Sequence, residues 1–196
     1  MVIDMQNAFL DPKGSCAKLG LDVDRLRAVV PGVKKLLSAA RQARLPVFHT
    51  RYIWQPDYSD GGIVTEFILP ALVEAGSLVA GSHDAEIYPE ITPKDGEILV
   101  DKNRPSAFHG TNLDATLRER GIDGLIVCGL TTNVCVETTV RDAMQRDFRV
   151  WVVDGATAEF EATRQAHALE SMAWMFASVV DLQHALGKIA GFARTG

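Results

Sequence analysis

The sequence predicts an α/β fold, a three-layer doubly wound sheet of about six parallel strands with helices on both faces. Short apolar runs alternate with longer segments of helical periodicity. Parallel strands need crossover connections, and these crossovers are mostly helices. The chain has 196 residues, of which 47% are hydrophobic and 23% charged, so it can bury a sizeable core. We expect a single domain over residues 1–196.

Strands are expected where short apolar runs stand between polar segments. They are predicted at residues 2–5, 46–50, 97–101, 124–129, 149–154 and 177–181. Helices are expected where apolar residues recur every three or four positions. They are predicted at residues 23–43, 111–120, 132–146, 163–175 and 182–190. Strand and helix therefore alternate along most of the chain.

The exception is a long excursion over residues 52–94, which carries a short helix near residues 66–74. Long excursions inside compact domains commonly cover active sites. A structural loop or a contact between subunits explains the segment equally well at this point.

The composition favours a small-molecule partner. The net charge is -5, and nucleic acids and anionic membranes are bound through clustered Lys and Arg, so we expect neither as a partner. No apolar run reaches the length of a membrane span, and the first residues lack a secretory signal pattern, so we expect a cytoplasmic protein. The cysteines Cys16, Cys128 and Cys135 are widely spaced and odd in number, which predicts at least one free thiol.

Three polar residues follow predicted strands. Asp4 closes the first strand, Lys102 follows the third, and Cys135 lies at the start of the helix after the fourth. In an open parallel sheet, ligands bind beyond the carboxyl ends of the strands, where the strand order reverses. We therefore expect these three side chains to converge at one edge of the sheet.

A cysteine at a helix start has the chemistry of a nucleophile, because the positive end of the helix dipole stabilises a thiolate and lowers the thiol pKa. The alternative is that Cys135 is a small buried apolar residue, the commoner role of a single cysteine. We assign Cys128, inside an apolar strand, to that role. Asp4 and Lys102 fit either proton transfer or a structural ion pair, and without the cysteine the ion pair would be favoured.

Three blocks carry a family resemblance: VIDMQNAF at residues 2–9, DKNRPSAF at 101–108 and GLTTNVCVETT at 129–139. In this order and spacing the chain resembles the isochorismatase-like cysteine hydrolases. These include nicotinamidases, N-carbamoylsarcosine amidases, ureidoacrylate amidases and biuret or triuret hydrolases. The resemblance spans nearly the whole chain, and it implies a catalytic triad of Asp4, Lys102 and Cys135 and a cis peptide between Leu130 and Thr131.

The resemblance also implies a mechanism. Asp4 would accept the thiol proton, Cys135 would attack an amide or ureido carbonyl, and the backbone N–H groups of Thr131 and Cys135 would hold the oxyanion. Thiol, carboxylate and water supply every step, so we expect no cofactor. The metal ligands of some nicotinamidases have no counterpart at residues 49–55, so we also expect no metal. The candidate substrate-binding residues are Phe9, Trp54, Arg104, Phe108 and Asn133.

Two other functions are compatible with the sequence. The chain could hydrolyse the vinyl ether of isochorismate or a related acid, or it could bind a ligand without turnover. The resemblance further suggests a homo-oligomer, a dimer or tetramer, with residues 52–94 at the contact. Arg51, Arg104 and His109 could contact a polar substrate, since a pocket-facing arginine binds a carboxylate well.

Overall fold

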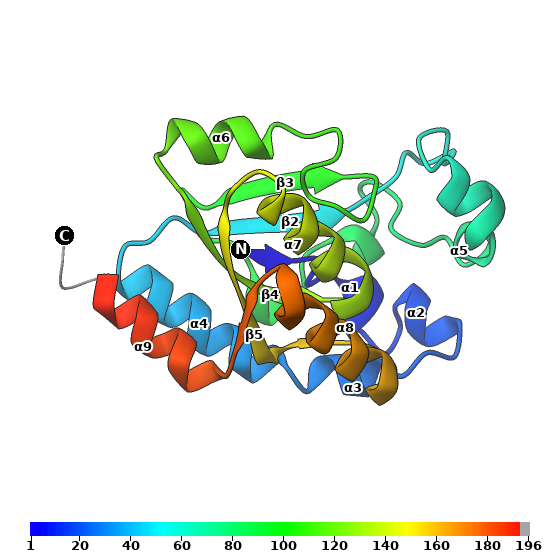
Figure 1. Ribbon diagram of the computed structural model, residues 1–196. Coiled ribbons are helices and arrows are strands. Elements are labelled where there is room, and N and C mark those ends of the chain that lie inside the picture. The colour runs from blue at the N-terminus through cyan, green and yellow to red at the C-terminus, as the bar shows by residue number, and fades with distance from the viewer. Residues whose placement is uncertain (193–196) are drawn as a thin grey trace.

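A six-stranded sheet forms the centre of the computed structural model, which describes residues 1–192 (Figure 1). Every strand pair is parallel, and the order across the sheet is β3-β2-β1-β4-β5-β6. The strands are β1 (Val2–Ile3), β2 (Phe48–Tyr52), β3 (Ile98–Lys102), β4 (Gly124–Leu130), β5 (Arg149–Ala158) and β6 (Ser178–Val180). The predicted parallel sheet is confirmed.

The strand order reverses at β1. The chain runs from β1 outward through β2 to β3, then crosses back and continues through β4, β5 and β6 on the other side. Val2 of β1 accordingly pairs with His49 of β2 on one side and with Cys128 of β4 on the other. The carboxyl ends of β1 and β4 therefore border the position where this type of sheet binds its ligands.

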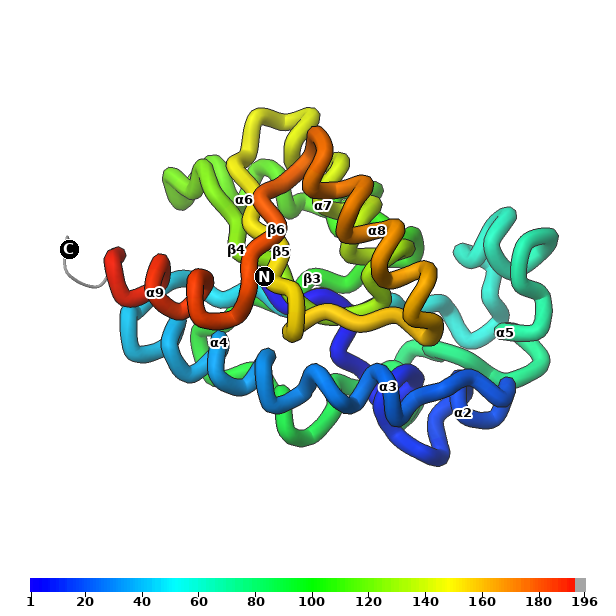
Figure 2. The backbone as a smooth tube through the Cα atoms, turned by 60° about the horizontal axis from the view of Figure 1, so that its bottom comes forward, coloured from blue at the N-terminus to red at the C-terminus, as the bar shows by residue number. Residues whose placement is uncertain are grey.

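Helices cover both faces of the sheet (Figure 2). On one face, α4 (Val30–Gln42) and α9 (Leu182–Phe192) pack together and both contact β5. The opposite face carries α6 (Leu113–Glu119), α7 (Glu137–Met144) and α8 (Ala162–Met175). Each layer has its own apolar cluster, the first with Val33, Leu36 and Ile189 and the second with Leu117, Val140 and Met172. The three-layer arrangement is confirmed.

The helix predicted over residues 23–43 is in fact two helices, α3 (Val23–Arg27) and α4. Pro31 lies in the first turn of α4, where its missing N–H removes no hydrogen bond. Inside a continuous helix the same ring would clash with the preceding turn. The prediction of one unbroken helix was wrong for this reason.

The remaining helical elements are too short to show a periodic pattern in the sequence. They include α1 (Asn7–Leu10), α2 (Ser15–Lys18), and the 3-10 turns η2 (His83–Ala85) and η3 (Pro89–Ile91). Within residues 1–192, none of the helices combines the length and the apolar character that a membrane crossing requires.

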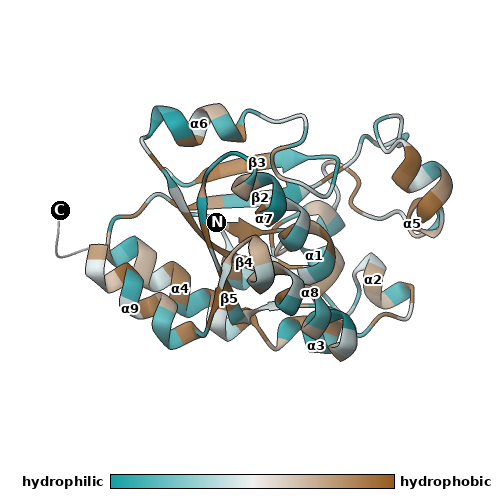
Figure 3. Ribbon diagram, in the orientation of Figure 1, coloured by the Kyte–Doolittle hydropathy of each residue, from teal (hydrophilic) through white to brown (hydrophobic). Residues whose placement is uncertain are grey.

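The excursion between β2 and β3 extends from one side of the body (Figures 1 and 2). It contains a π-helical turn, η1 (Val64–Ile68), and α5 (Ala71–Glu74), close to the short helix predicted there. Its residues around α5 are hydrophobic, as the brown colour in Figure 3 shows, and several of these side chains are exposed. They are Ile63, Phe67, Ile68, Leu69 and Val73. An apolar surface of this kind is typical of a contact site.

Candidate active site

Asp4 follows β1 directly and has a left-handed backbone conformation, with φ of 46°. Such backbone strain in a non-glycine residue is concentrated at functional sites. The side chain is completely buried, and the Thr50 hydroxyl donates a hydrogen bond of 2.5 Å to its Oδ1 atom. The Asp4 N–H donates back to the same hydroxyl at 3.1 Å. Thr50, which the sequence did not single out, therefore fixes the orientation of the carboxylate.

Lys102 is the last residue of β3, and its Nζ atom lies 2.7 Å from Asp4 Oδ2. Both side chains have no exposed surface. Burial alone would lower the pKa of Lys102, but Asp4 and Cys135 outweigh this effect and raise it above the ordinary value. The lysine is consequently a permanent buried cation, paired with the carboxylate and donating to the Arg104 backbone oxygen at 3.2 Å.

Cys135 lies in a π-helical turn, η4 (Thr132–Val136), which leads into α7. Turns of this kind are frequent at functional sites. The residue is 3% exposed, and burial raises the pKa of its thiol. Lys102 acts in the opposite direction, and Asp4 adds to the increase. Loss of hydration is the largest of these effects, so the net direction is opposite to the lowering expected from the helix start alone.

The sheet explains why these three residues meet. Asp4 and Cys135 follow the adjacent strands β1 and β4, and Lys102 reaches Asp4 from β3 across β2. Gly129 permits the close approach of β4 to β1, since a Cβ atom there would lie 2.1 Å from the Ile3 carbonyl oxygen. Its φ of 115° also favours glycine. The predicted convergence at one edge of the sheet is therefore present in the structure.

The segment between β4 and Cys135 begins with a cis peptide between Leu130 and Thr131, as the resemblance implied. The Thr131 carbonyl oxygen accepts hydrogen bonds from the N–H groups of Val134 and Val136, at 3.2 and 3.1 Å. These bonds wrap the turn around Thr131. Both residues predicted to hold an oxyanion, Thr131 and Cys135, lie in this turn.

Polar side chains from β5 and α8 support the same turn. The Thr132 hydroxyl lies 2.9 Å from the Thr157 hydroxyl and donates to Gln165 Oε1 at 2.6 Å. Glu159 is buried at the end of β5, and its carboxyl interacts with the Thr131 side chain. Burial raises the pKa of Glu159. Sequence reasoning missed these supporting residues, because no local pattern distinguishes them.

The predicted substrate-binding residues occupy different environments. Trp54 is buried and donates from Nε1 to the Asn103 backbone oxygen at 3.3 Å. Arg104 is half-buried, and its Nη1 atom donates to the Asp60 backbone oxygen at 2.8 Å. Asn133 lies two residues before Cys135, and its buried Oδ1 atom has no hydrogen-bond partner in residues 1–192.

Two further candidates lie in apolar surroundings. Phe9 is half-buried between the two apolar clusters, and Phe108 packs against Phe148 at 5.9 Å between ring centroids. Two other side chains were expected to contact a polar substrate. Arg51 instead forms a bidentate ion pair with Asp101, with both N···O distances at 2.8 Å. His109 is exposed.

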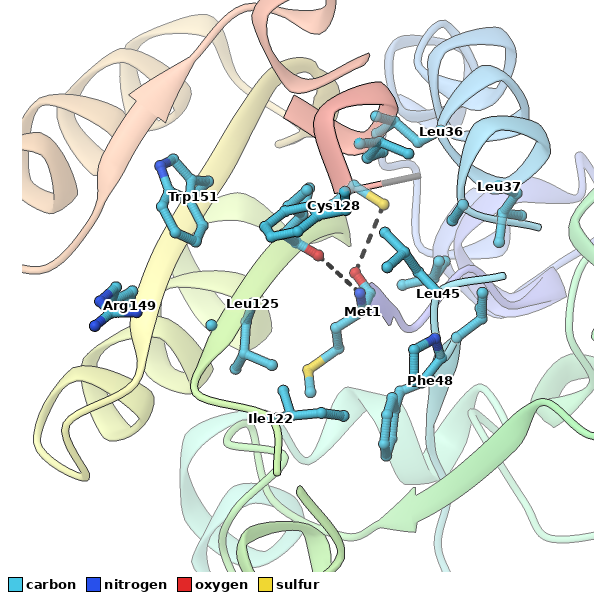
Figure 4. A pocket seen from close by; sticks show the side chains of 18 of the residues that line it. Met1, Leu36, Leu37, Leu45, Phe48, Ile122, Leu125, Cys128, Arg149 and Trp151 are labelled. Atoms are coloured by element: carbon cyan, nitrogen blue, oxygen red, sulfur yellow. Dashed lines mark hydrogen bonds between the residues drawn. The ribbon is translucent and has the colours of Figure 1, made fainter. Parts of the chain in front are cut away.

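An apolar cavity of about 380 Å³ lies at the amino edge of the sheet (Figure 4). Leu36, Leu45, Phe48 and Trp151 are among the side chains that line it. Cys128 also lines this cavity, where its thiol donates to the backbone oxygen of Met1 at 3.6 Å. Burial raises the pKa of this thiol to about 11. The assignment of Cys128 to an apolar environment is thus consistent with its place in the fold.

Comparisons with known proteins agree with this geometry. The isochorismatase domain model matches residues 1–184. The ureidoacrylate amidohydrolase RutB of Agrobacterium fabrum is 36% identical over 170 residues, covering 80% of this chain and 74% of that protein. RutB of Klebsiella pneumoniae is 33% identical over 210 aligned positions, covering 98% of this chain and 88% of that protein.

Solved structures show the same relationship. A cysteine hydrolase from Pseudomonas syringae pv. phaseolicola superposes with a TM-score of 0.88 at 32% identity, covering 97% of this chain and 91% of that one. An N-carbamoylsarcosine amidase from Thermoplasma acidophilum gives a TM-score of 0.74 at 26% identity, covering 92% and 94%. The sequence match, the six-stranded parallel sheet and the cluster at its carboxyl edge together show that the chain belongs to the isochorismatase family.

Proposed function

We propose that the chain is a cysteine-dependent amidohydrolase that cleaves a C–N bond of a small amide, carbamoyl or ureido compound and releases ammonia or an amine. The observation that carries this proposal is the fully buried Asp4–Lys102 ion pair beside the Cys135 thiol. Ureidoacrylate is the first candidate substrate, because the curated relatives are named ureidoacrylate amidohydrolases.

The first half of the reaction forms a covalent intermediate. The Asp4 carboxylate accepts the thiol proton as the Cys135 sulfur forms a bond to the carbonyl carbon, and the carbonyl electron pair moves to oxygen. The C–N bond then breaks, and protonated Asp4 gives its proton to the leaving nitrogen. The product on the enzyme is a thioester for an amide substrate and a thiocarbamate for a ureido substrate.

The second half regenerates the enzyme. Asp4 accepts a proton from a water molecule, the resulting hydroxide attacks the thioester or thiocarbamate carbonyl, and the C–S bond breaks. The proton on Asp4 returns to the sulfur. The raised pKa of Cys135 supports this sequence, because the sulfur becomes anionic only while Asp4 holds the proton.

Lys102 and the turn before Cys135 supply electrostatic stabilisation. Lys102 stays charged throughout, holds Asp4 in place and favours the thiolate over the thiol. The backbone N–H groups of Thr131 and Cys135 hold the oxyanion, and one such donor contributes about 3 kcal/mol to the stability of the transition state. Asn133 Oδ1, which is buried and has no partner among residues 1–192, accepts a hydrogen bond from a substrate N–H.

We propose that the pocket wall and its polar contacts come from Phe9, Trp54, Arg104 and Phe108, together with Asn133. The burial of Trp54 and the half-buried position of Arg104 support this assignment, and Phe108 is buried and packs against Phe148.

We also propose that the chain acts as one domain in a homo-oligomer, a dimer or tetramer, in the cytoplasm. The exposed apolar side chains of η1 and α5 support a contact between copies through the excursion. The free thiols of Cys16, Cys128 and Cys135 fit a reducing compartment. Light scattering of the wild type and of Phe67→Ser tests the contact, and a monomeric wild type would contradict it.

The activity is tested by measuring ammonia released from nicotinamide, N-carbamoyl amino acids, biuret, triuret and ureidoacrylate. The wild type should release ammonia from at least one of them, and a rapidly quenched sample should show added mass on the peptide that contains Cys135. Release of pyruvate from isochorismate without release of ammonia would instead support vinyl ether hydrolysis. Absence of turnover with tight binding would support a binding protein.

A further inference from the structure

One buried hydroxyl contacts both ends of the segment that carries the Thr131 N–H, one of the two proposed oxyanion donors. Thr157 Oγ1 donates to the Gly129 backbone oxygen at 2.8 Å and lies 2.9 Å from Thr132 Oγ1. Gly129 and Thr132 directly flank the dipeptide formed by Leu130 and Thr131. Both contacts are buried. The position of this dipeptide therefore depends on the Thr157 side chain.

Gln165 of α8 fixes the Thr132 end of the segment. Its Nε2 atom donates to the Thr157 backbone oxygen at 3.1 Å, which turns its Oε1 atom toward Thr132. The Thr132 hydroxyl donates to that Oε1 atom at 2.6 Å. Since each hydroxyl has one proton, the Thr157 proton is shared between the Gly129 oxygen and the Thr132 oxygen. Thr132, Thr157 and Gln165 thus form one connected polar network.

An irregularity in β5 brings Thr157 to this point. Val127 of β4 pairs with Val152 of β5, and Gly129 pairs with Thr157. One residue of β4 therefore lies opposite four residues of β5, numbers 153–156. Extra residues of this kind bend a strand and redirect the side chains that follow, and they are frequent beside active sites.

Helix α4 supports the irregular stretch from one face of the sheet. A Cβ atom at Gly32 would lie 2.6 Å from the Gly155 carbonyl oxygen, so the helix backbone packs directly against the strand. Gly155 has φ of 83°, a conformation that glycine adopts at little cost. Ala156 beside it is completely buried. The Thr157 hydroxyl is therefore presented from a closely packed backbone.

The polar network acts on the Thr131 N–H more directly than on the sulfur. Thr132 is bonded to Thr131, whereas Cys135 lies three residues further along η4. The Cys135 sulfur interacts instead with Lys102 and Asp4, which belong to the other side of the site. Loosening the polar network displaces the oxyanion donor and leaves the thiol with its partners.

We propose that Thr157 and Gln165 are positioning residues, which fix the segment 129–132 so that the Thr131 N–H points at the oxyanion developing on the substrate carbonyl. The inference rests on the proposed amidohydrolase function and adds two residues to it, both of which act through Thr132 and Gly129. An oxyanion donor stabilises the transition state only when it is held at the right distance from the developing charge, so its displacement lowers kcat with little effect on KM.

The experiment compares turnover with a reaction of the same sulfur that needs no oxyanion donor. Iodomethane methylates a cysteine thiolate with loss of iodide, and it contains no carbonyl oxygen. Thr157→Val keeps the side-chain shape and removes the hydroxyl. For the compound that the wild type hydrolyses fastest, it should lower kcat about tenfold or more and change KM less than about threefold. The rate of Cys135 methylation, measured by mass spectrometry of its peptide, should stay within about twofold of the wild type.

Three further variants sharpen the comparison. Thr157→Ser retains the hydroxyl and should recover most of kcat. Thr116→Val is the matched control, since the Thr116 hydroxyl also donates to a backbone oxygen, that of Asn112, but in α6; it should leave both rates unchanged. Gln165→Leu acts at the Thr132 end and should give the same pattern with a smaller loss, which provides a second measurement if Thr157→Val does not fold.

Equal losses in turnover and methylation, an unchanged kcat in the folded Thr157→Val and Gln165→Leu variants, or no recovery in Thr157→Ser would overturn the positioning role while leaving the proposed function intact. A wild type that is methylated at Cys135 but releases ammonia from none of the amide and ureido compounds would refute both.

Discussion

The carboxyl and amino edges of the sheet each contain a buried cysteine, and the two thiols differ in what surrounds them. Burial raises the pKa of both Cys135 and Cys128. Cys135 lies close to the carboxylate of Asp4, whereas Cys128 lies beside an apolar cavity lined by leucine and aromatic side chains (Figure 4). Under the proposed mechanism, a buried thiol becomes a nucleophile where a carboxylate can take its proton, and the size of a neighbouring cavity does not identify it.

The ion pairs at the two edges differ in the same way. Asp4 and Lys102 have no exposed surface and meet at the strand ends. At the amino edge, Glu97 accepts from Arg41 at 2.6 Å and lies 2.9 Å from His49 Nε2, linking α4 to the sheet. The first pair lies at the proposed active site, and the second joins a helix to the sheet at the opposite edge.

The largest difference in activity between the two edges is expected when each cysteine is replaced in turn. Cys135→Ala should lower kcat/KM about 10⁴-fold or more, because the bond to the substrate carbon cannot form. Cys128→Ala removes a thiol of similar burial and should change kcat/KM less than about threefold. Ammonia release measures both. Comparable losses in the two variants would mean that the sulfur at position 135 has no special role.

Removal of the proposed base gives the next largest effect. Asp4→Asn should lower kcat about 10³-fold, since the thiol then has no carboxylate to accept its proton. Glu97→Gln changes a carboxylate at the opposite edge and should leave kcat within about twofold. Circular dichroism checks that both variants are folded. Substantial activity in folded Asp4→Asn would contradict general-base catalysis by this residue.

Thr50 tests whether orientation of the base matters. Thr50→Val keeps the side-chain shape but removes the hydrogen bond to Asp4, and a hydrogen bond to a charged group contributes about 1.5–3 kcal/mol. We expect kcat to fall about tenfold or more, with a smaller change in KM. Thr50→Ser, which retains the hydroxyl, should recover most of the activity. Loss of activity in Thr50→Ser as well would indicate a packing defect.

The smallest expected effect concerns stability at the amino edge. Burial alone would raise the pKa of Glu97, but Arg41, the Lys94 N–H and His49 lower it from 4.5 to about 2. A lowered folded-state pKa stabilises the protein fully above pH 4.5, and this stabilisation is lost as the pH falls toward 2.

Glu97→Gln should accordingly reduce the free energy of unfolding at pH 7 by about 1 kcal/mol, a value discounted for solvent screening. Urea denaturation at a series of pH values should show the difference between wild type and variant shrinking below pH 4.5. A difference that is constant with pH would rule out this linkage.

Several features could be predicted because they depend on local sequence. The six strands overlap the apolar runs of the sequence, and Asp4 and Lys102 stand at strand ends that any parallel sheet brings to one edge. Thr50 and Tyr52 could not be selected in this way. Their positions depend on the register of β2 against its neighbours, which places the Thr50 hydroxyl against Asp4 and the Tyr52 ring beside Lys102.

The sequence by itself determined the class of fold, the family blocks and the three residues that meet beside the strand-order reversal, because each of these is encoded in short-range pattern and chain order. The tertiary structure decided the direction in which the Cys135 pKa is shifted, the break before Pro31 and the burial of the Tyr52 hydroxyl without a partner among residues 1–192. These properties depend on which groups exclude water from one another, and that is settled only when distant segments pack together.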